Sequence, residues 1–164
     1  MTRCFWCGTD PFYCQYHDEE WGVPVWDDQR LFEFLVLEGA QSGLSWITIL
    51  RKRENYRAAF DHFDPHKVAR YGSTQVESLL QNAGIIRNRK KIESAIKNAQ
   101  AFLKIQEEFG SFAKYQWGFV DGTPIINALK DKSEIQAQTP LSVAWAKDLK
   151  QRGFSFLGPV VVYS

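Results

Sequence analysis

The sequence of 164 residues predicts an all-α protein with a single globular domain. Apolar residues recur at helical spacing over most of the chain, and residues suited to helix ends flank many of these stretches. The length and the hydrophobic content of 45% are sufficient for one buried core. No internal repeat or linker divides the sequence, so we expect residues 1–164 to form one helical domain.

The expected helices follow one another along the chain, separated by turn residues. They cover residues 11–19, 29–40, a stretch from about 45 to 60, 65–69, 73–83, 88–107, 111–119 and 140–152. The stretch VDGTPIINALKDKSEIQAQ has the weakest pattern and predicts the longest loop. The final segment PVVVYS predicts the start of a further helix or core strand, so we expect the domain to continue into a C-terminal tail that is missing here.

Capping residues support several of these boundaries. A side-chain acceptor precedes a proline at three predicted helix starts: Asp10-Pro11, Asp64-Pro65 and Thr139-Pro140. Asp27 or Asp28 is suited to cap the second helix, and Ser73 the fifth helix, which Gly84 then ends. The clearest apolar stripe belongs to the 88–107 helix: Ile92, Ala95, Ile96, Ala99, Phe102 and Leu103.

The composition restricts the functional classes. The net charge is +1, so binding to a polyanion would need a local cluster of basic residues. No apolar segment of a signal peptide follows Met1, and the longest apolar runs are too short to span a bilayer. Three cysteines crowded at one end do not resemble a secreted disulfide framework. We therefore expect a cytoplasmic protein without membrane association.

The first candidate site is a cluster of cysteines and a histidine near the N-terminus. Cys4-x2-Cys7 and Cys14-x2-His17 supply four side chains of the types that bind zinc. The two pairs lie closer in sequence than in most zinc modules, so two alternatives stay open. All four residues bind one metal ion, or some of the cysteines are small buried core residues.

The second candidate is Glu38. It continues the apolar face of Leu31, Phe34 and Leu35 in an almost uncharged stretch. A carboxylate on a core-facing stripe is costly unless it is paired or hydrogen-bonded, which makes Glu38 a candidate site residue. Alternatively, Glu38 simply reaches solvent beside Gly39 at the end of its helix.

Aromatic residues surround these positions in the sequence. Tyr13 and Tyr16 share one face of the first predicted helix, Trp6 and Trp21 lie nearby in the chain, and Trp46 follows after Glu38. Aromatic rings next to a carboxylate are suited to hold a flat, electron-poor or cationic ring. Ordinary core packing is the alternative for each of them.

A fourth candidate is the segment AGIIRNRKK between two amphipathic helices. Gly84 supplies a turn, and Arg87, Arg89, Lys90 and Lys91 concentrate positive charge around it. The pattern is that of a helix–hairpin–helix motif, whose turn and following helix start can bind a DNA phosphate. The alternative is a glycine-terminated helix followed by a solvated basic face.

Taken together, the sequence resembles the DNA-3-methyladenine glycosylase type I family. The resemblance is carried by RCFW, DPFYCQYHDEEWGVP, LFEFLVLEGAQSGLSWITILRKRENYRAAF, FDPHKVA, NAGIIRNRKKI and KQRGFSFLGPVVVYS, which cover nearly the whole chain in order. It implies the all-α fold of the helix–hairpin–helix glycosylase superfamily. It also implies an enzyme that flips 3-methyladenine out of double-stranded DNA and hydrolyses its glycosidic bond.

The resemblance also implies roles for the candidate residues. Glu38 is expected to contact the alkylated base as the catalytic residue, with Tyr16 and Trp46 stacking on it or framing it. Trp6 and Tyr13 are expected to line the same pocket. The remaining expected roles are those of the DNA-binding residues: Gly43, Leu44, Gly84, Ile85, Arg87 and Arg89.

The family binds a structural zinc ion, and Cys4 and His17 match two of its ligands. The other two family ligands lie in a C-terminal tail beyond Ser164, and Cys7 and Cys14 match no family ligand. We expect a monomer that hydrolyses the bond without a covalent intermediate, because no lysine occupies the lyase position. Two alternatives are a non-catalytic helix–hairpin–helix DNA-binding module and a zinc-stabilised interaction domain.

Overall fold

The structure is a computed structural model that describes residues 3–128 and 132–164, and every regular element in these ranges is helical. This confirms the all-α prediction. The elements before the hairpin are η1 (Phe5–Cys7), α1 (Pro11–Glu19), α2 (Asp28–Gln41), α3 (Trp46–Arg51), α4 (Arg53–Ala59), η2 (Asp61–Phe63), α5 (Pro65–Val68) and α6 (Ser73–Gln81). Those after it are α7 (Arg89–Phe109), α8 (Phe112–Gly118), η3 (Lys132–Glu134), α9 (Pro140–Gln151) and α10 (Pro159–Tyr163).

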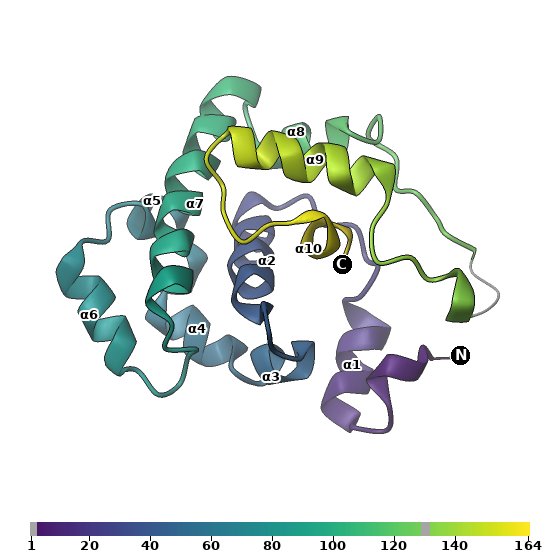
Figure 1. The fold of residues 1–164 in the computed structure, drawn as a ribbon, viewed down its shortest axis with the longest axis horizontal. Helices are drawn as coiled ribbons and strands as arrows, with labels where there is room; N and C mark the ends of the chain where they lie inside the picture. The colour runs from purple at the N-terminus through teal and green to yellow at the C-terminus, as the bar shows by residue number, and fades with distance from the viewer. Residues whose placement is uncertain (1–2, 129–131) are drawn as a thin grey trace.

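Two helices, α2 and α7, form the centre of the molecule (Figure 1). The short helices α5 and α6 flank α7 on one side, and α8 and α9 lie across the top of the view. On the other side, α1 and the C-terminal α10 complete the fold. The first and last segments of the chain therefore lie in the same half of the molecule.

Aromatic packing between these central helices forms the core. The rings of Phe32 on α2 and Phe102 on α7 lie 5.3 Å apart, and Phe102 stacks on Phe112 of α8 at 4.3 Å. All three side chains are completely buried. Burying one such side chain contributes about 1.5–3 kcal/mol to folding, so this trio fixes three helices against one another.

The predicted caps are present at the helix starts. The Asp10 carboxylate accepts hydrogen bonds from the Phe12 N–H at 3.0 Å and from the Tyr13 N–H at 3.3 Å, and Asp64 and Thr139 act in the same way. For α2 the capping residue is Asp27.

Asp28 has a different role from its neighbour. Its carboxylate accepts from the N–H groups of Phe112 at 2.8 Å and Ala113 at 2.9 Å, which fixes the start of α8 against α2. One aspartate of the pair therefore begins a helix, and the other joins two helices.

Three boundaries differ from the predictions. The stretch expected as one helix from about 45 to 60 is divided at Lys52, where ψ is 0°, into α3 and α4. The cap of α6 is Gly72 instead of Ser73, and the Gln75 side chain accepts from the Gly72 N–H at 3.1 Å. The same helix ends at Gln81, before Gly84, because Asn82 already has extended backbone angles.

The C-terminal segment is helical rather than a strand, and α10 begins at Pro159. The chain before it is tied to α7 by Asn98, which is fully buried. The Asn98 amide donates to the Ser155 carbonyl at 3.0 Å and accepts from the Ser155 N–H at 2.9 Å. The predicted long loop contains η3, and its residues 129–131 lie outside the described part.

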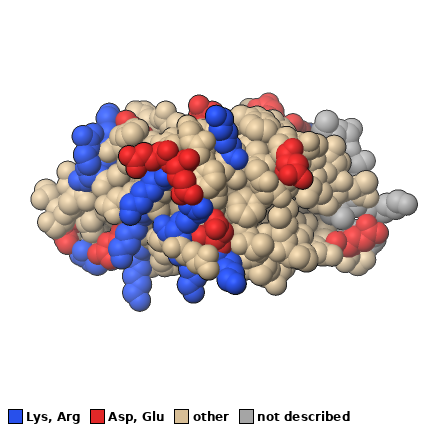
Figure 2. Space-filling view, turned by 90° about the horizontal axis from the view of Figure 1, so that it is seen from above, with Lys and Arg blue, Asp and Glu red and all other residues tan. Residues whose placement is uncertain are grey.

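Among the described residues, no helix is both long and apolar enough to cross a membrane. The face seen from above in Figure 2 carries Lys and Arg side chains interspersed with Asp and Glu. This face therefore has no extended field of one sign, in agreement with a net charge of +1.

Candidate active site

A cavity of about 320 Å³ lies between the end of α1, one face of α2, α8, α9 and the C-terminal α10. Most of its walls are aromatic and aliphatic. Its lining includes Tyr16, Trp21, Phe34, Glu38, Trp117 and Val161. A mainly apolar cavity with few polar groups is the usual form of a site for a small flat ligand.

Glu38 enters this cavity from the third turn of α2. The stripe of Leu31, Phe34, Leu35 and Glu38 was expected to face the core, but all four residues line the cavity. The deepest core face of α2 carries other residues instead, among them Phe32, which is fully buried. The sequence therefore correctly placed these residues on one face of a helix, but that face lines a cavity instead of the packed core.

The environment of Glu38 favours the neutral acid. Burial raises the pKa of Glu38 from 4.5 to about 7, while a hydrogen bond that Oε2 accepts from the Ser164 hydroxyl at 3.2 Å opposes this rise. No ion pair is found for Glu38 within the described residues. A carboxyl group with a pKa of about 7 can change its charge when a cationic ligand arrives.

The predicted aromatic residues gather around Tyr16. Its ring lies 5.7 Å from Trp46, 6.3 Å from Trp6 and 6.4 Å from Tyr13. Only Tyr16 of these four belongs to the cavity lining; the other three pack around it. The aromatic cluster therefore supports one wall, while Trp21 adds a second ring to the lining.

The tyrosine hydroxyls lie in the field of the Glu38 carboxylate. Burial raises the pKa of Tyr16 well above its usual value, and the charge of Glu38 raises it further. Burial and the charges of Cys7 and Glu38 also raise the pKa of Tyr13. Both phenols stay protonated at neutral pH, so they are available as hydrogen-bond donors.

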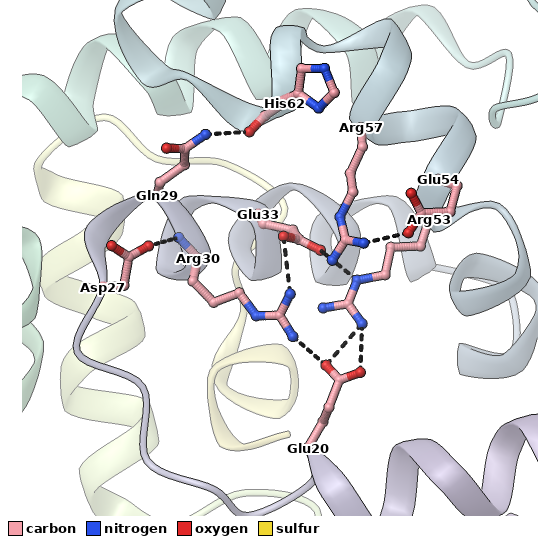
Figure 3. Close-up of polar contacts among 9 residues, drawn as sticks. All are labelled: Glu20, Asp27, Gln29, Arg30, Glu33, Arg53, Glu54, Arg57 and His62. Carbon is pink, nitrogen blue, oxygen red and sulfur yellow. Dashed lines mark hydrogen bonds and ion pairs between the residues drawn. The ribbon is translucent and has the colours of Figure 1, made fainter.

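An ion-pair network joins the end of α1 to α2, two elements that line the cavity (Figure 3). Glu33 on α2 accepts hydrogen bonds from Arg53 and Arg57 on α4, the latter at 2.9 Å. Glu20, just after α1, pairs with Arg30 and with Arg53 at 2.8 Å. The network therefore connects α1, α2 and α4 through a buried pair, Arg53 and Glu33, and three partly exposed partners.

The sequence interpretation missed this network. Its local signals are Glu33, a charged residue between Phe32 and Phe34, and Arg30 three residues earlier, which pairs with Glu33. The other contacts are distant in the chain, because Arg53 lies 20 residues from Glu33 and 33 residues from Glu20. The network reaches the cavity directly, since Glu20 and Phe34 line it.

The network also contacts the Phe34 ring. The guanidinium groups of Arg30 and Arg53 lie 5.2 and 5.5 Å from the centre of this ring, which is the geometry of a cation–π contact. The ring is therefore held between the cavity and the charged groups behind it.

The hairpin of the predicted helix–hairpin–helix motif is formed by residues 82–88 between α6 and α7. Its apolar residue Ile85 is buried, and α4 supports the turn. The Asn55 amide donates to the Gly84 carbonyl at 3.2 Å, and the Tyr56 hydroxyl accepts from the Ile86 N–H at 3.1 Å. A Cβ atom at Gly84 would lie only 3.0 Å from the Asn55 side chain, which explains the glycine.

The turn itself offers fewer free N–H groups than the motif suggested. The Gly84 N–H donates to the Asn82 side chain at 2.8 Å, and the Ile85 N–H to the Asn82 carbonyl at 3.4 Å. At the start of α7, the N–H groups of Arg89 and Lys90 have no hydrogen-bond acceptor in the described part of the chain. The first turn of α7 is therefore the better anchor for a phosphate.

The basic residues of the segment separate into three kinds. Arg87 and Lys90 are exposed and make no ion pair to any described residue. Arg89 is paired with Glu77 at 2.7 Å. Lys91 turns inward, so only part of the predicted cluster is available to an anion.

The loop of Gly43 and Leu44 lies between α2 and α3. Gly43 has φ +79°, a left-handed conformation that favours glycine, and the Leu44 N–H donates to the Gln41 carbonyl. The Leu44 side chain is 40% exposed at the tip of this loop. An exposed leucine on a tight turn is suited to contact an apolar partner such as a base stack.

Cys4 and His17 lie together, as the Cys4 N–H donates to His17 Nε2 at 3.2 Å. The thiols of Cys7 and Cys14 instead contact the carbonyls of Cys4 and Gly8. Within residues 3–128 and 132–164, no three His, Cys, Asp or Glu side chains converge as metal ligands. The four-ligand site therefore does not form in this arrangement.

Known proteins are similar to this chain in sequence and fold. The methyladenine glycosylase family model matches residues 6–164. DNA-3-methyladenine glycosylase 1 of Escherichia coli (strain K12) is 50% identical over 164 residues, which cover 100% of this chain and 88% of that protein. A crystal structure of 3-methyladenine DNA glycosylase I superposes with a TM-score of 0.95 at 52% identity, covering 99% of this chain and 89% of the other.

A second structure addresses 3-methyladenine recognition by the glycosylase I of Staphylococcus aureus. It superposes with a TM-score of 0.96 at 41% identity, covering 99% of this chain and 87% of the other.

Proposed function

This chain belongs to the methyladenine glycosylase family, and we propose that its cavity beside Glu38 receives the alkylated base. The protein is a DNA glycosylase that removes 3-methyladenine in base excision repair. The observation that carries the assignment of the site is the position of Glu38, a half-buried carboxyl group without a cationic partner among the described residues, in an aromatic cavity.

The chemistry of the substrate explains why such a site is suitable. Methylation at N3 gives adenine in DNA a positive charge, which weakens the glycosidic bond. A cationic base entering the cavity favours the ionised form of Glu38, so the carboxylate and the base stabilise each other. Tyr16 supplies an aromatic surface beside the base. An uncharged normal adenine lacks this attraction and pays the full cost of unstacking.

Hydrolysis needs little acid catalysis, because the cationic base is already a good leaving group. The C1′–N9 bond breaks as a water oxygen bonds to C1′, the base leaves as a neutral molecule, and the water proton passes to solvent. No residue forms a covalent intermediate, and an abasic site remains. The protein contributes orientation and electrostatic stabilisation.

We also propose how the DNA is held. The first turn of α7 binds a phosphate, Arg87 adds charge, and Leu44 contacts the stack where the base leaves the duplex. The free N–H groups of α7 and the exposure of Leu44 support this arrangement. The substrate is double-stranded DNA bound by a monomer in the cytoplasm.

A structural zinc ion is a further part of the proposal. The Cys4 backbone N–H lies 3.2 Å from His17 Nε2, and this proximity of the two residues supports a role for them as two of its ligands. Zinc would hold the start of the chain against α1 and has no part in the hydrolysis. Elemental analysis should find zinc that is lost in Cys4→Ser and retained in Cys7→Ser. Zinc-free, fully folded protein would contradict the proposal.

The assay for the site is release of free base from methylated duplex DNA. Wild-type protein should release 3-methyladenine, Glu38→Gln should release it at least 100-fold more slowly, and exposed Glu107→Gln on α7 serves as the matched control. Near-normal release by Glu38→Gln would remove Glu38 from the mechanism. If the wild type bound DNA but released no 3-methyladenine, it would be a non-catalytic DNA-binding module. If it showed no salt-dependent DNA binding, it would be an interaction domain without nucleic acid.

A further inference from the structure

The amine of Lys91 is directed into the protein, although it belongs to the basic run after the hairpin. Lys91 lies in the first turn of α7, and its Nζ donates to the Ala40 carbonyl at 2.8 Å and to the Ser42 carbonyl at 2.6 Å. These carbonyls are at the C-terminal end of α2, where helical carbonyls lack intrahelical partners. A lysine amine there satisfies them and complements the helix dipole.

This contact joins three functional parts of the molecule. Glu38 lies two residues before Ala40 on the same helix, and Gly43 and Leu44 follow Ser42 directly. On the other side, Lys91 belongs to the turn of α7 whose free N–H groups are the proposed phosphate anchor. One side chain therefore links the phosphate anchor to the loop that faces the base stack and to the helix that carries the carboxylate.

The neighbouring residue provides a natural comparison. Lys90 has the same charge and adjacent backbone, but it is exposed and makes no ion pair to a described residue. The amine of Lys91 already has two carbonyl acceptors, and its burial lowers the pKa of Lys91. Lys91 is thus poorly placed to neutralise a phosphate, whereas Lys90 is free to do so.

We propose that Lys91 is a positioning residue that sets the Gly43–Leu44 loop relative to the helix–hairpin–helix motif. When the motif holds a phosphate, the Lys91 amine keeps the loop at the base step next to it. This inference rests on the proposed function, because it concerns the base-flipping step of that reaction. Loss of the amine should leave the charge facing the DNA unchanged and misplace the loop, which lowers the rate of flipping.

The test compares Lys91→Met with Lys90→Met and with Lys97→Met, an exposed position on the same helix. Two quantities are measured on the full chain. One is the slope of log binding constant against log salt concentration for methylated duplex DNA, and the other is the single-turnover rate of 3-methyladenine release at saturating enzyme. Fluorescence of 2-aminopurine beside the lesion reports flipping directly.

We expect Lys91→Met to keep the wild-type salt slope and to lose at least tenfold in single-turnover rate and in the flipping signal. Lys90→Met should reduce the slope by about 0.9, the amount for one phosphate contact. Lys97→Met should match the wild type. Lys91→Arg, which restores a donor to the two carbonyls, should recover much of the rate, which separates positioning from a general loss of folding.

Two results would overturn the inference. A reduced salt slope for Lys91→Met, as for Lys90→Met, would make Lys91 a phosphate ligand. An unchanged rate and flipping signal would show that the loop does not depend on Lys91. A wild-type protein that released no 3-methyladenine would instead refute the proposed function, so the two failures are distinguishable.

Discussion

Replacement of Arg53 by methionine should destabilise the protein by loosening α1 from the helices behind it. The Arg53 guanidinium holds Glu33 through Nε and both oxygens of Glu20 through Nη1, at 2.8 and 3.0 Å. The side chains of Arg53 and Glu33 are only 7% and 8% exposed. Methionine keeps much of the length of the side chain but removes its charge and its donors.

The size of the effect follows from what remains in the network. Removing one partner of a buried ion pair costs about 3–5 kcal/mol, because the other charge stays buried. Glu33 keeps Arg57 at 2.9 Å and Arg30 at 3.4 Å, so we expect the lower end, about 3 kcal/mol. In a chain of this length, such a loss lowers Tm by about 6–12 °C.

Urea unfolding monitored by circular dichroism measures this loss. The matched control is Arg51→Met, two residues earlier, since the Arg51 side chain is 62% exposed and its pair with Asp10 lies in water. An exposed pair contributes little, so this control should unfold almost like the wild type. A loss below about 1 kcal/mol for Arg53→Met, or equal losses for both variants, would refute the reasoning.

Three further results are expected. Burial raises the pKa of Glu38 from its ordinary value of 4.5 to about 7, so between these pH values the folded protein keeps a proton that the unfolded chain releases. The wild type therefore loses stability as pH rises through this window, whereas Glu38→Gln does not. In urea unfolding, the stability of Glu38→Gln relative to the wild type should grow over this range and level off above pH 7. Gly84→Ala should lower Tm and weaken DNA binding, because its Cβ would lie 3.0 Å from Asn55. In the control Gly118→Ala, the added Cβ would meet no atom within 4 Å, so this variant should gain about 0.5–1 kcal/mol of stability. Leu44→Ala, at a 40% exposed position, should leave Tm unchanged and reduce single-turnover base release severalfold; an unchanged rate would argue against its contact with the base stack.

Local chemistry accounts for the features that the sequence predicted well. The caps of Asp10, Asp64 and Thr139 lie where expected, because a cap needs only a side-chain acceptor and the next two or three amide groups. The hairpin between α6 and α7 was predicted correctly because its signals, Gly84 and the two amphipathic helices beside it, are also local. Helix boundaries that depend on tertiary contacts, such as the division at Lys52, were not predicted.

The face of α2 that carries Glu38 shows where sequence periodicity stops being informative. The spacing of Leu31, Phe34 and Leu35 with Glu38 correctly placed these residues on one side of a helix. Whether this side meets a packed core or a cavity depends on α1 and α10, which approach it from opposite ends of the chain. Only this tertiary arrangement partly buries Glu38 without a cationic partner among the described residues.

Two charged residues, Arg53 and Lys91, also have positions that only the tertiary structure decides. In the sequence, Arg53 and Lys91 resemble solvent-exposed members of basic runs, since a long charged side chain is normally exposed. In the structure, Arg53 meets Glu20 from 33 residues away, and Lys91 meets Ala40 from 51 residues away. Hydrogen bonds and ion pairs act over a few ångströms in space, so the folded chain alone decides which of these charges face the DNA and which ones hold the site together.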